Sequence, residues 1–437
     1  MIAEFRVKNF LSIKTEQCLS FDVTPDTLMK EEYSIEVKEG VRLLKLALIY
    51  GANASGKTNI LLALSFFQKI MNDIPKDKTE KLNTIPFLLD NSSRKEPSDF
   101  FISFYLNHER YELSLKVDNY RIYKETLVCY PGTQPATLYS RTYNDQSDST
   151  EINFGKKLGL SKKSQMIIIG NTINNCSVLA AFGKSNIETT RLNVVYDFFS
   201  QHMSEILRPT TSLSPYIKRN LDEDQDNEMK EFLINILKAS DFNISGVMLK
   251  EEEEIITPEM EKLIESAPIP NEAKQEMFKK GKITNYELLF KHNTDNGEFE
   301  LSEDLESRGT IRFMGMAVIL KKILFENNIV PIDEIETSLH YELLSYFIKV
   351  FLANSDKNSQ LIMTTHDINL LDENFIRRDS VWFTDKDNYG ETHLIRLSSM
   401  GLHKNLSPYN AYMQGKLVKL PFLGSIYLKD NNLCEEK

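Results

Sequence analysis

The chain of 437 residues has only four cysteines, and no two of them form a C-x-x-C pair. Cys18, Cys129, Cys176 and Cys434 are widely spaced, which argues against a disulfide framework and against a zinc site. We therefore expect reduced thiols, as in a cytoplasmic protein.

Long apolar runs are also absent. No run approaches 18 residues, and the charged side chains of Glu4, Arg6 and Lys8 interrupt the N-terminal segment. A membrane-spanning helix needs about 20 apolar residues, and a signal peptide needs an uninterrupted apolar stretch. We expect neither feature, and hence no membrane partner.

Positive charge is in deficit. The chain has 52 basic and 63 acidic residues, a net charge of −11, which argues against a generally basic nucleic-acid binder. Lys156, Lys157, Lys162 and Lys163 could form a local basic patch, although a solvated face is the simpler interpretation. Nucleic-acid binding is compatible with the charge but not indicated by it. The apolar content of 41% is typical of globular proteins, and the length allows two or three domains.

The most informative motif is Gly-Ala-Asn-Ala-Ser-Gly-Lys-Thr at residues 51–58, between an apolar run and a helix-like segment. Gly51 and Gly56 leave room for backbone N–H groups to face a polyphosphate at a helix N-terminus. Lys57 can reach the β- and γ-phosphates of ATP, and the Thr58 hydroxyl can ligate Mg²⁺. The alternative is a glycine-rich turn before a helix, but the strand and helix context favours nucleotide binding.

Two further apolar segments end in polar residues. Residues 329–332 precede Asp333, which could hold Mg²⁺, and Glu334, which could polarise the attacking water. Residues 361–365 precede His366, whose neutral imidazole could contact the γ-phosphate and sense its loss. Each signal alone has a structural alternative, a surface acid pair or a histidine at a strand end. Together they predict Lys57, Glu334 and His366 as catalytic residues.

These motifs resemble the ABC-type ATPase heads of the SMC and RecF class. Residues 5–13 contain the Asn-Phe pair that precedes the nucleotide site in that class. Residues 51–59 are similar to its G-x-N-x-S-G-K-[ST]-N loop, and residues 333–340 resemble the D-E-x-E-x-x-L-H version of its acidic strand and D-loop. That version is found in the compact OLD-like and RecF-like ATPases of bacterial defence and repair loci, and the chain most resembles the compact OLD-like AAA ATPases of anti-phage defence loci. The resemblance covers about residues 1–180 and 300–425.

The resemblance implies an α/β fold, in which a P-loop core sheet is joined to an antiparallel β subdomain. It also implies a signature loop that reaches the partner subunit's γ-phosphate across a dimer. Residues 305–312 lie where that loop is expected and keep a Ser307-x-Gly309 core, with Arg308 in place of the usual glycine. An ordinary helix N-cap is the alternative. The implied nucleotide-binding residues are Gly51, Asn53, Ser55, Gly56, Lys57, Thr58, Asn59, Ser307 and Gly309, with Thr58 and Asp333 for the metal.

The pattern of the chain suggests three stretches. Residues 1–183 form an N-terminal ATPase lobe that includes a hairpin around residues 107–110. Residues 184–300 form a helical, acidic insertion, with charge runs at 222–226 and 251–254 and a returning hairpin whose turn lies at 293–297. Residues 301–437 form the C-terminal lobe. No heptad pattern is sustained, so we expect no long coiled coil. No Q-loop glutamine can be placed; Gln68 lies on the helix after the phosphate loop, which is the wrong place for it.

The C-terminal part of the chain resembles the same compact family. Residues 381–387 are similar to a last strand of its core sheet, and residues 412–416 and 420–422 to its usual ending. Asp385 and Asp387 suggest metal ligands of a nuclease, but a TOPRIM domain would need on the order of 100 further residues. A loop between two strands is the preferred interpretation.

The sequence thus predicts an ATPase that converts ATP and water to ADP and phosphate as a homodimer or higher homo-oligomer. The resemblance implies a subunit of an anti-phage defence system that switches an effector encoded nearby, of the TOPRIM-type or HNH nuclease class. A RecF-like repair ATPase and an assembly platform that uses slow hydrolysis as a timer are the alternatives.

Overall fold

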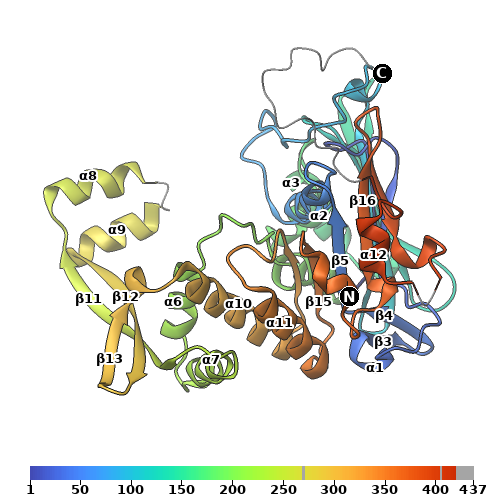
Figure 1. The fold of residues 1–437 in the computed structure, drawn as a ribbon. Helices are drawn as coiled ribbons and strands as arrows, with labels where there is room; N and C mark the ends of the chain where they lie inside the picture. The colour runs from blue at the N-terminus through green and yellow to red at the C-terminus, as the bar shows by residue number, and fades with distance from the viewer. Residues whose placement is uncertain (268–270, 404–405, 420–437) are drawn as a thin grey trace, which may run out of the picture. The chain divides into compact units, whose positions relative to one another are not determined.

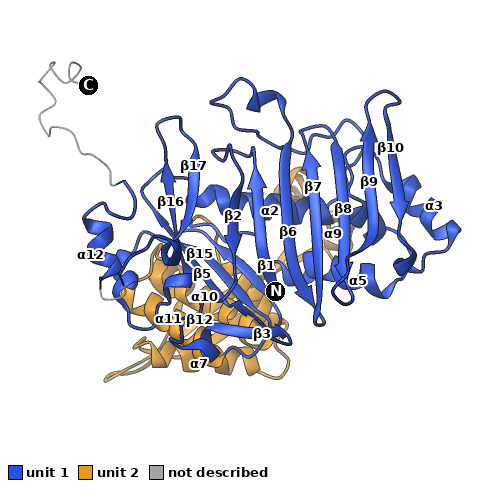
Figure 2. Cartoon of the chain, turned by 90° about the vertical axis from the view of Figure 1, so that its right-hand side faces the viewer, with its two compact units in different colours: residues 1–209, 326–335, 355–437 blue, residues 210–325, 336–354 orange. Residues whose placement is uncertain are grey.

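The computed structural model describes residues 1–267, 271–403 and 406–419. The chain divides into two compact units, shown in different colours in Figure 2. Unit 1 comprises residues 1–209, 326–335 and 355–437, and unit 2 comprises residues 210–325 and 336–354. The bounds of the two units do not coincide with those of the three predicted stretches, whose limits stay a prediction. Residues 420–422 and Cys434 lie outside the described residues, while Cys18, Cys129 and Cys176 are free thiols, as expected.

The nucleotide-loop strand lies in the middle of a five-stranded sheet in unit 1 (Figure 1). Four strands are parallel and the last is antiparallel. In sheet order they are β14 (Ile329–Ile332), β15 (Gln360–Thr364), β5 (Leu46–Gly51), β16 (Val381–Lys386) and β17 (Thr392–Arg396). All six residues of β5 are buried, as expected for a strand covered on both faces. Parallel pairing brings the carboxyl ends of β14, β15 and β5 to one edge.

Helix α2 (Lys57–Asn72) follows the loop and buries an apolar stripe that includes Ile60, Leu64, Phe67 and Met71. These positions recur every three or four residues, so one side of the helix faces the core. On the same helix Gln68 donates from Nε2 to the carbonyl oxygens of residues 199 and 203, at 3.1 and 3.2 Å. Gln68 therefore has a structural contact.

Unit 1 also contains a seven-stranded antiparallel sheet (Figure 2), which confirms the predicted β subdomain. The predicted turn at Asn107 and His108 has left-handed backbone, with φ of 49° and 63°, as a two-residue hairpin turn requires. In sheet order the strands are β10 (Ser149–Phe154), β9 (Ala136–Asn144), β8 (Ile122–Tyr130), β7 (Glu109–Val117), β6 (Ser98–Leu106), β1 (Ile2–Lys8) and β2 (Gln17–Ser20).

The Asn-Phe pair after β1 fixes a long loop. Asn9 is only 2% exposed; its Nδ2 donates to the carbonyl oxygen of Ser93 at 2.9 Å, and its Oδ1 accepts from the backbone N–H of Phe87 at 3.0 Å. Phe10 packs against Phe100, with ring centroids 5.4 Å apart. The pair therefore holds the long connection between α2 and β6.

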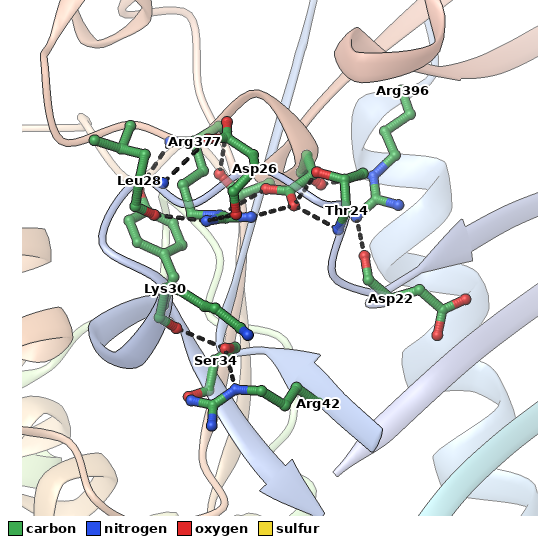
Figure 3. Close-up of polar contacts among 12 residues, drawn as sticks. Asp22, Thr24, Asp26, Leu28, Lys30, Ser34, Arg42, Arg377 and Arg396 are labelled. Carbon is green, nitrogen blue, oxygen red and sulfur yellow. Dashed lines mark hydrogen bonds and ion pairs between the residues drawn. The ribbon is translucent and has the colours of Figure 1, made fainter. Parts of the chain in front are cut away.

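A buried ion pair ties the segment after β2 to the C-terminal part of unit 1 (Figure 3). Arg377 and Asp379 are both fully buried, and the guanidinium donates to both carboxylate oxygens, at 2.9 and 2.6 Å. Arg377 also donates to the carbonyl oxygens of Asp26 and Leu28, and Thr24 donates to Asp379. Burial alone would raise the pKa of Asp379, but the hydrogen bonds from Arg377 and Thr24 outweigh it and lower the pKa.

The remaining elements of unit 1 are short. They are α1 (Lys30–Tyr33), β3 (Ser34–Lys38), β4 (Val41–Leu44), α3 (Lys162–Asn171), α4 (Val178–Gly183), α5 (Thr190–Asp197), a π-helix (Phe198–His202), α12 (Pro408–Met413) and several 3₁₀ turns. Across the described ranges, no helix combines the length and the apolar content that crossing a membrane requires.

Unit 2 combines helices with a three-stranded antiparallel sheet in the order β11, β12, β13. The predicted returning hairpin is confirmed, because β12 ends at Thr294 and β13 begins at Gly297. Helix α10 packs against α6, α7 and α11 and is buried along most of its length. The elements are α6 (Ser214–Asp222), α7 (Glu228–Ala239), β11 (Ile244–Ile255), α8 (Pro258–Ser266), α9 (Asn271–Lys280), β12 (Lys282–Thr294), β13 (Gly297–Ser302), α10 (Arg308–Phe325) and α11 (Tyr341–Asn354).

The prediction that the insertion is helical is wrong for residues 251–254. The four glutamates lie on β11 and pair with residues 283–286 of β12. Lysines compensate for their charge, since Lys250 forms an ion pair with Glu252 and Lys282 forms one with Glu253. Cross-strand pairing therefore overrides the low strand propensity of glutamate. The longest helix of the described residues, α10, has 18 residues, so these residues contain no long coiled coil.

Candidate functional site

The loop between β5 and α2 is shaped by two glycines. Gly51 and Gly56 have φ values of 156° and 103°. A Cβ atom on Gly51 would lie 2.3 Å from Thr384 Oγ1, and one on Gly56 would lie 2.2 Å from Thr392 Oγ1, so neither position has room for a side chain. Lys57, the first residue of α2, is 5% exposed and donates from Nζ to the carbonyl oxygen of Gly51 at 3.0 Å. Its ammonium group thus lies over the loop, where a phosphate would bind.

Hydroxyl oxygens from two elements, α2 and β15, converge on Asp333, which directly follows β14. Thr58 donates to both carboxylate oxygens, at 3.1 and 3.0 Å, and Thr364 donates to Oδ1 at 2.6 Å. Asp333 is only 5% exposed, and among the described residues no basic side chain forms an ion pair with it. A buried carboxylate beside hydroxyl oxygens is a donor set that suits Mg²⁺. The predicted metal residues Thr58 and Asp333 are therefore brought together.

Glu334 and His366 also meet at this edge. Glu334 has a left-handed backbone, with φ of 47°, and its N–H donates to Thr364 Oγ1 at 2.8 Å. This turn leaves the carboxylate partly exposed, 3.8 Å from Nε2 of His366. A carboxylate that water can reach, next to an imidazole, can accept a proton from that water.

Three other predicted nucleotide-binding residues belong to the same loop or helix. The Oγ of Ser55 lies 2.6 Å from Thr384 Oγ1, and Asn59 donates from Nδ2 to Ser12 Oγ at 2.6 Å. Asn53 is exposed at the middle of the loop. The side chains of Ser55 and Asn59 thus bond to the protein, while their backbone N–H groups stay part of the loop and of the first turn of α2.

Ser307 and Gly309 belong to unit 2. Ser307 Oγ accepts from the N–H of Thr310 at 3.0 Å, so Ser307 caps the start of α10. A Cβ atom on Gly309 would lie 3.1 Å from the carbonyl oxygen of Ser338. The N-cap interpretation is confirmed, and the signature role toward a partner's phosphate stays a prediction.

The predicted loop between two strands is confirmed for Asp387, which lies in the turn between β16 and β17, and is wrong for Asp385, which lies on β16 and pairs with His393 of β17. Asp387 Oδ1 accepts from the backbone N–H groups of Tyr389 and Glu391, at 2.9 Å each. Asp385 Oδ1 accepts from the N–H of Lys386 at 3.0 Å. The Asp387 carboxylate therefore shapes the turn between the two strands.

Sequence reasoning missed four hydroxyl residues of the site. Thr364 contacts both Asp333 and Glu334, and the Thr-Thr-His end of its strand could have indicated it. Ser12 lies within the recognised N-terminal motif. Thr384 and Thr392 contact the loop from more than 300 residues away in sequence, and no local pattern marks them.

Comparison with known proteins places these residues inside a recognised family. The model described as "AAA domain, putative AbiEii toxin, Type IV TA system" matches residues 46–372, which include Lys57, Asp333, Glu334 and His366. No curated protein matches the sequence.

Several solved structures are similar in fold at low sequence identity. The SMC head domain from Thermotoga maritima is 12% identical, with 90% of this chain and 98% of that chain covered and a TM-score of 0.40. An SMC head bound to the C-winged helix domain of ScpA is 11% identical, with 94% and 99% covered and a TM-score of 0.41. An SMC head with an extended coiled coil, bound to the C-terminal domain of ScpA derived from Pyrococcus furiosus, is 11% identical, with 94% and 98% covered and a TM-score of 0.36.

Proposed function

Because the chain belongs to this AAA-domain family, which is matched over residues 46–372, we propose that it binds ATP with Mg²⁺ and hydrolyses it. One observation carries the proposal. Lys57 and Thr58 after β5, Asp333 and Glu334 after β14, and His366 after β15 meet at one edge of the parallel sheet. A glycine loop, a buried lysine and an acid pair at one site are the parts that hydrolysis of a nucleotide γ-phosphate uses.

Each residue has a distinct role in this proposal. Lys57 exchanges its contacts with the carbonyl oxygens of Gly51 and Ala52 for the β- and γ-phosphate oxygens of ATP. Thr58 and Asp333 would hold Mg²⁺, which supplies positive charge to the phosphates when bound. Glu334 accepts a proton from the attacking water, and His366 contacts the γ-phosphate through Nε2.

The test is ATP binding and phosphate release by the wild type and by Lys57→Ala. Removing the ammonium from a site with few alternative charges should abolish ATP binding. Lys69→Ala is the matched control, because Lys69 is an exposed lysine on the same helix that pairs with Asp73. Unchanged ATP affinity in Lys57→Ala would contradict the assignment of the loop.

We further propose that the chain works in the cytoplasm as a homodimer or higher homo-oligomer, in which Ser307 and Gly309 of one copy complete the partner's ATP site. The biological role we favour is a subunit of an anti-phage defence system that holds or releases an effector, of the TOPRIM-type or HNH nuclease class. A ligand can switch such an effector only if the effector binds the two ATP states differently.

The family description favours a second candidate, in which this chain is itself the toxin. Expression of the chain alone separates the two, since a sensor should leave growth unchanged. Co-purification with the neighbouring gene product, with and without ATP, tests the effector. Cell killing by the chain alone, or a neighbour that never associates, would contradict the sensor role; a DNA-stimulated ATPase rate would instead favour the RecF-like repair alternative.

A further inference from the structure

The hairpin formed by β16 and β17 holds the nucleotide loop through two buried threonines. Thr384 and Thr392 are both 0% exposed. Thr384 Oγ1 donates to the carbonyl oxygen of Tyr50 at 3.2 Å and lies 2.6 Å from Ser55 Oγ. Thr392 Oγ1 donates to the carbonyl oxygen of Ser55 at 2.8 Å. The loop itself contributes few backbone hydrogen bonds, such as that from the N–H of Ser55 to Ala52 at 3.2 Å.

A second set of contacts extends this support to α2. Ser12 Oγ lies 2.7 Å from Thr392 Oγ1, and Asn59 donates from Nδ2 to Ser12 Oγ at 2.6 Å. The backbone N–H of Thr392 also donates to the carbonyl oxygen of Ser12 at 2.8 Å. Residues from the N-terminal segment, the hairpin and the first turn of α2 therefore share one network with the loop.

The direction of every hydrogen bond in the network follows from the number of protons. A hydroxyl has one proton, and a carbonyl oxygen can only accept. Because Thr392 gives its proton to the carbonyl oxygen of Ser55, Ser12 must donate to Thr392, and Ser12 in turn accepts from Asn59. By the same reasoning Ser55 Oγ donates to Thr384, which donates to Tyr50. The result is two relays. One runs from Asn59 through Ser12 and Thr392 to the carbonyl oxygen of Ser55 in the loop. The other runs from the Ser55 hydroxyl through Thr384 to the carbonyl oxygen of Tyr50 on β5.

The two threonines occupy the space that the loop glycines leave open. A Cβ atom on Gly51 or Gly56 would lie within 2.3 Å of Thr384 Oγ1 or Thr392 Oγ1, respectively. Each hydroxyl is thus seated against a glycine at one end of the loop. Movement of the hairpin would change the backbone at both ends, so the conformations of hairpin and loop are coupled.

We infer that Thr384 and Thr392 are positioning residues that keep the nucleotide loop in its ATP-binding conformation, an inference that rests on the proposed ATPase function. ATP binds only loop conformations in which the N–H groups face the phosphates. A loop that adopts this conformation for a fraction of the time shows an apparent Kd raised by the inverse of that fraction. The hydroxyls therefore act on the Kd for ATP, while the reacting groups Glu334 and His366 are unchanged.

The test compares Thr384→Val and Thr392→Val with the wild type, by binding of ATP with Mg²⁺ and by steady-state hydrolysis. Valine keeps the shape and removes the hydroxyl. Each variant should raise the Kd for ATP about tenfold, the effect of one buried hydrogen bond, with kcat within about twofold. Thr392→Ser keeps the hydroxyl, so its Kd for ATP should equal that of the wild type. Wild-type Kd values in both valine variants would overturn the inference.

Thr126→Val is the matched control, because Thr126 on β8 has a buried hydroxyl that forms no hydrogen bond with any described residue. It should leave the Kd unchanged. If Thr392→Val fails to fold, Ser12→Ala tests the same relay without a change in the hairpin. In a double-mutant cycle, Ser12→Ala should add little to Thr392→Val, since either one breaks the relay. Fully additive effects would overturn the relay.

Hydrogen exchange separates a failure of this inference from a failure of the proposed function. The amides of residues 52–57 should exchange faster in Thr392→Val than in the wild type, with or without nucleotide. A wild type that binds no ATP would refute the proposed function, while faster exchange in the variant would still show that Thr392 holds the conformation of the loop. If the wild type binds ATP and the amides of Thr392→Val exchange at the wild-type rate, the positioning role alone is refuted.

Discussion

At the scale of single residues, Glu334 has an uncommon backbone conformation. A φ of 47° in a residue with a side chain costs of the order of 1 kcal/mol, so the surrounding contacts must hold it. The hydrogen bond from its N–H to Thr364, which also bonds Asp333, supplies that support. The turn separates two adjacent carboxylates, so that Asp333 is buried and Glu334 faces water.

We expect Glu334→Gln to bind ATP and to hydrolyse it about 10²–10⁴-fold more slowly, because an amide cannot accept a proton from water. It should also trap the closed, ATP-bound assembly. Phosphate release and size-exclusion chromatography with ATP measure the two effects. Turnover at the wild-type rate would move the catalytic role elsewhere, with Glu336 as the next candidate, so Glu336→Gln is the companion variant.

A second residue gives a prediction about pH. Lys45 is 2% exposed and donates from Nζ to the carbonyl oxygen of Ser355 at 2.9 Å. Burial lowers the pKa of Lys45 to about 8 from its ordinary value of 10.5. Between these values the unfolded chain binds more protons than the folded one, so Lys45 makes stability rise with pH across this window.

Replacing Lys45 with Met should remove this dependence. The free energy of unfolding of the wild type minus that of Lys45→Met should rise by at most about 3 kcal/mol between pH 8 and 10.5. Urea unfolding at several pH values measures it, and the subtraction cancels the other groups that titrate there. A constant difference across this window would show that Lys45 keeps its ordinary pKa.

At the scale of elements, two parts of the insertion hold the segment before Ser307. His292 on β12 lies 2.5 Å from Glu306 through Nε2. Glu303 accepts from Ser214 and forms an ion pair with Lys218, both on α6. The predicted signature segment is thus positioned by elements outside the ATPase motifs. Through these contacts the insertion can influence the proposed composite site.

If Ser307 acts on a partner's γ-phosphate, His292→Ala should lower kcat about tenfold, the effect of a lost hydrogen bond to a charged group. The Kd for ATP should stay unchanged, because the nucleotide loop makes no use of His292. Lys291→Ala is the control on the same strand, where Lys291 pairs with the exposed Glu300. Equal kcat in His292→Ala and the control would refute this link.

The sequence predicted the elements whose function depends on a local pattern. Lys57, Asp333 and His366 each follow an apolar strand, and parallel pairing alone brings strand ends together. The strand at residues 251–254 could not be predicted, because it depends on pairing with β12, which begins at Lys282, 29 residues beyond Glu253. The roles of Thr384 and Thr392 could not be predicted either, because their hydrogen-bond partners lie far away in sequence. A threonine by itself does not indicate which group its hydroxyl will contact.

At the scale of the whole molecule, the proposed assembly has a specific geometry. Each ATP would lie between the loop of one copy, with Lys57, and the signature segment of its partner, with Ser307. In a two-fold dimer, this arrangement makes two equivalent composite sites. A subunit with a defective nucleotide loop and a subunit with a defective signature segment should therefore form one intact site when they are mixed.

Ser307→Arg and Lys57→Ala should each be inactive as a homodimer. When the two are mixed, each mixed dimer should contain one site built from an intact loop and an intact signature segment, and a second site with both defects. Phosphate release should then appear at up to about one quarter of the wild-type rate, because half of the dimers are mixed and half of their sites are intact. The control is a mixture in which Lys57→Ala is replaced by a chain carrying both substitutions, which offers no intact signature segment. Activity in this control, or no activity in the first mixture when subunit exchange is shown to occur, would contradict a site shared between copies.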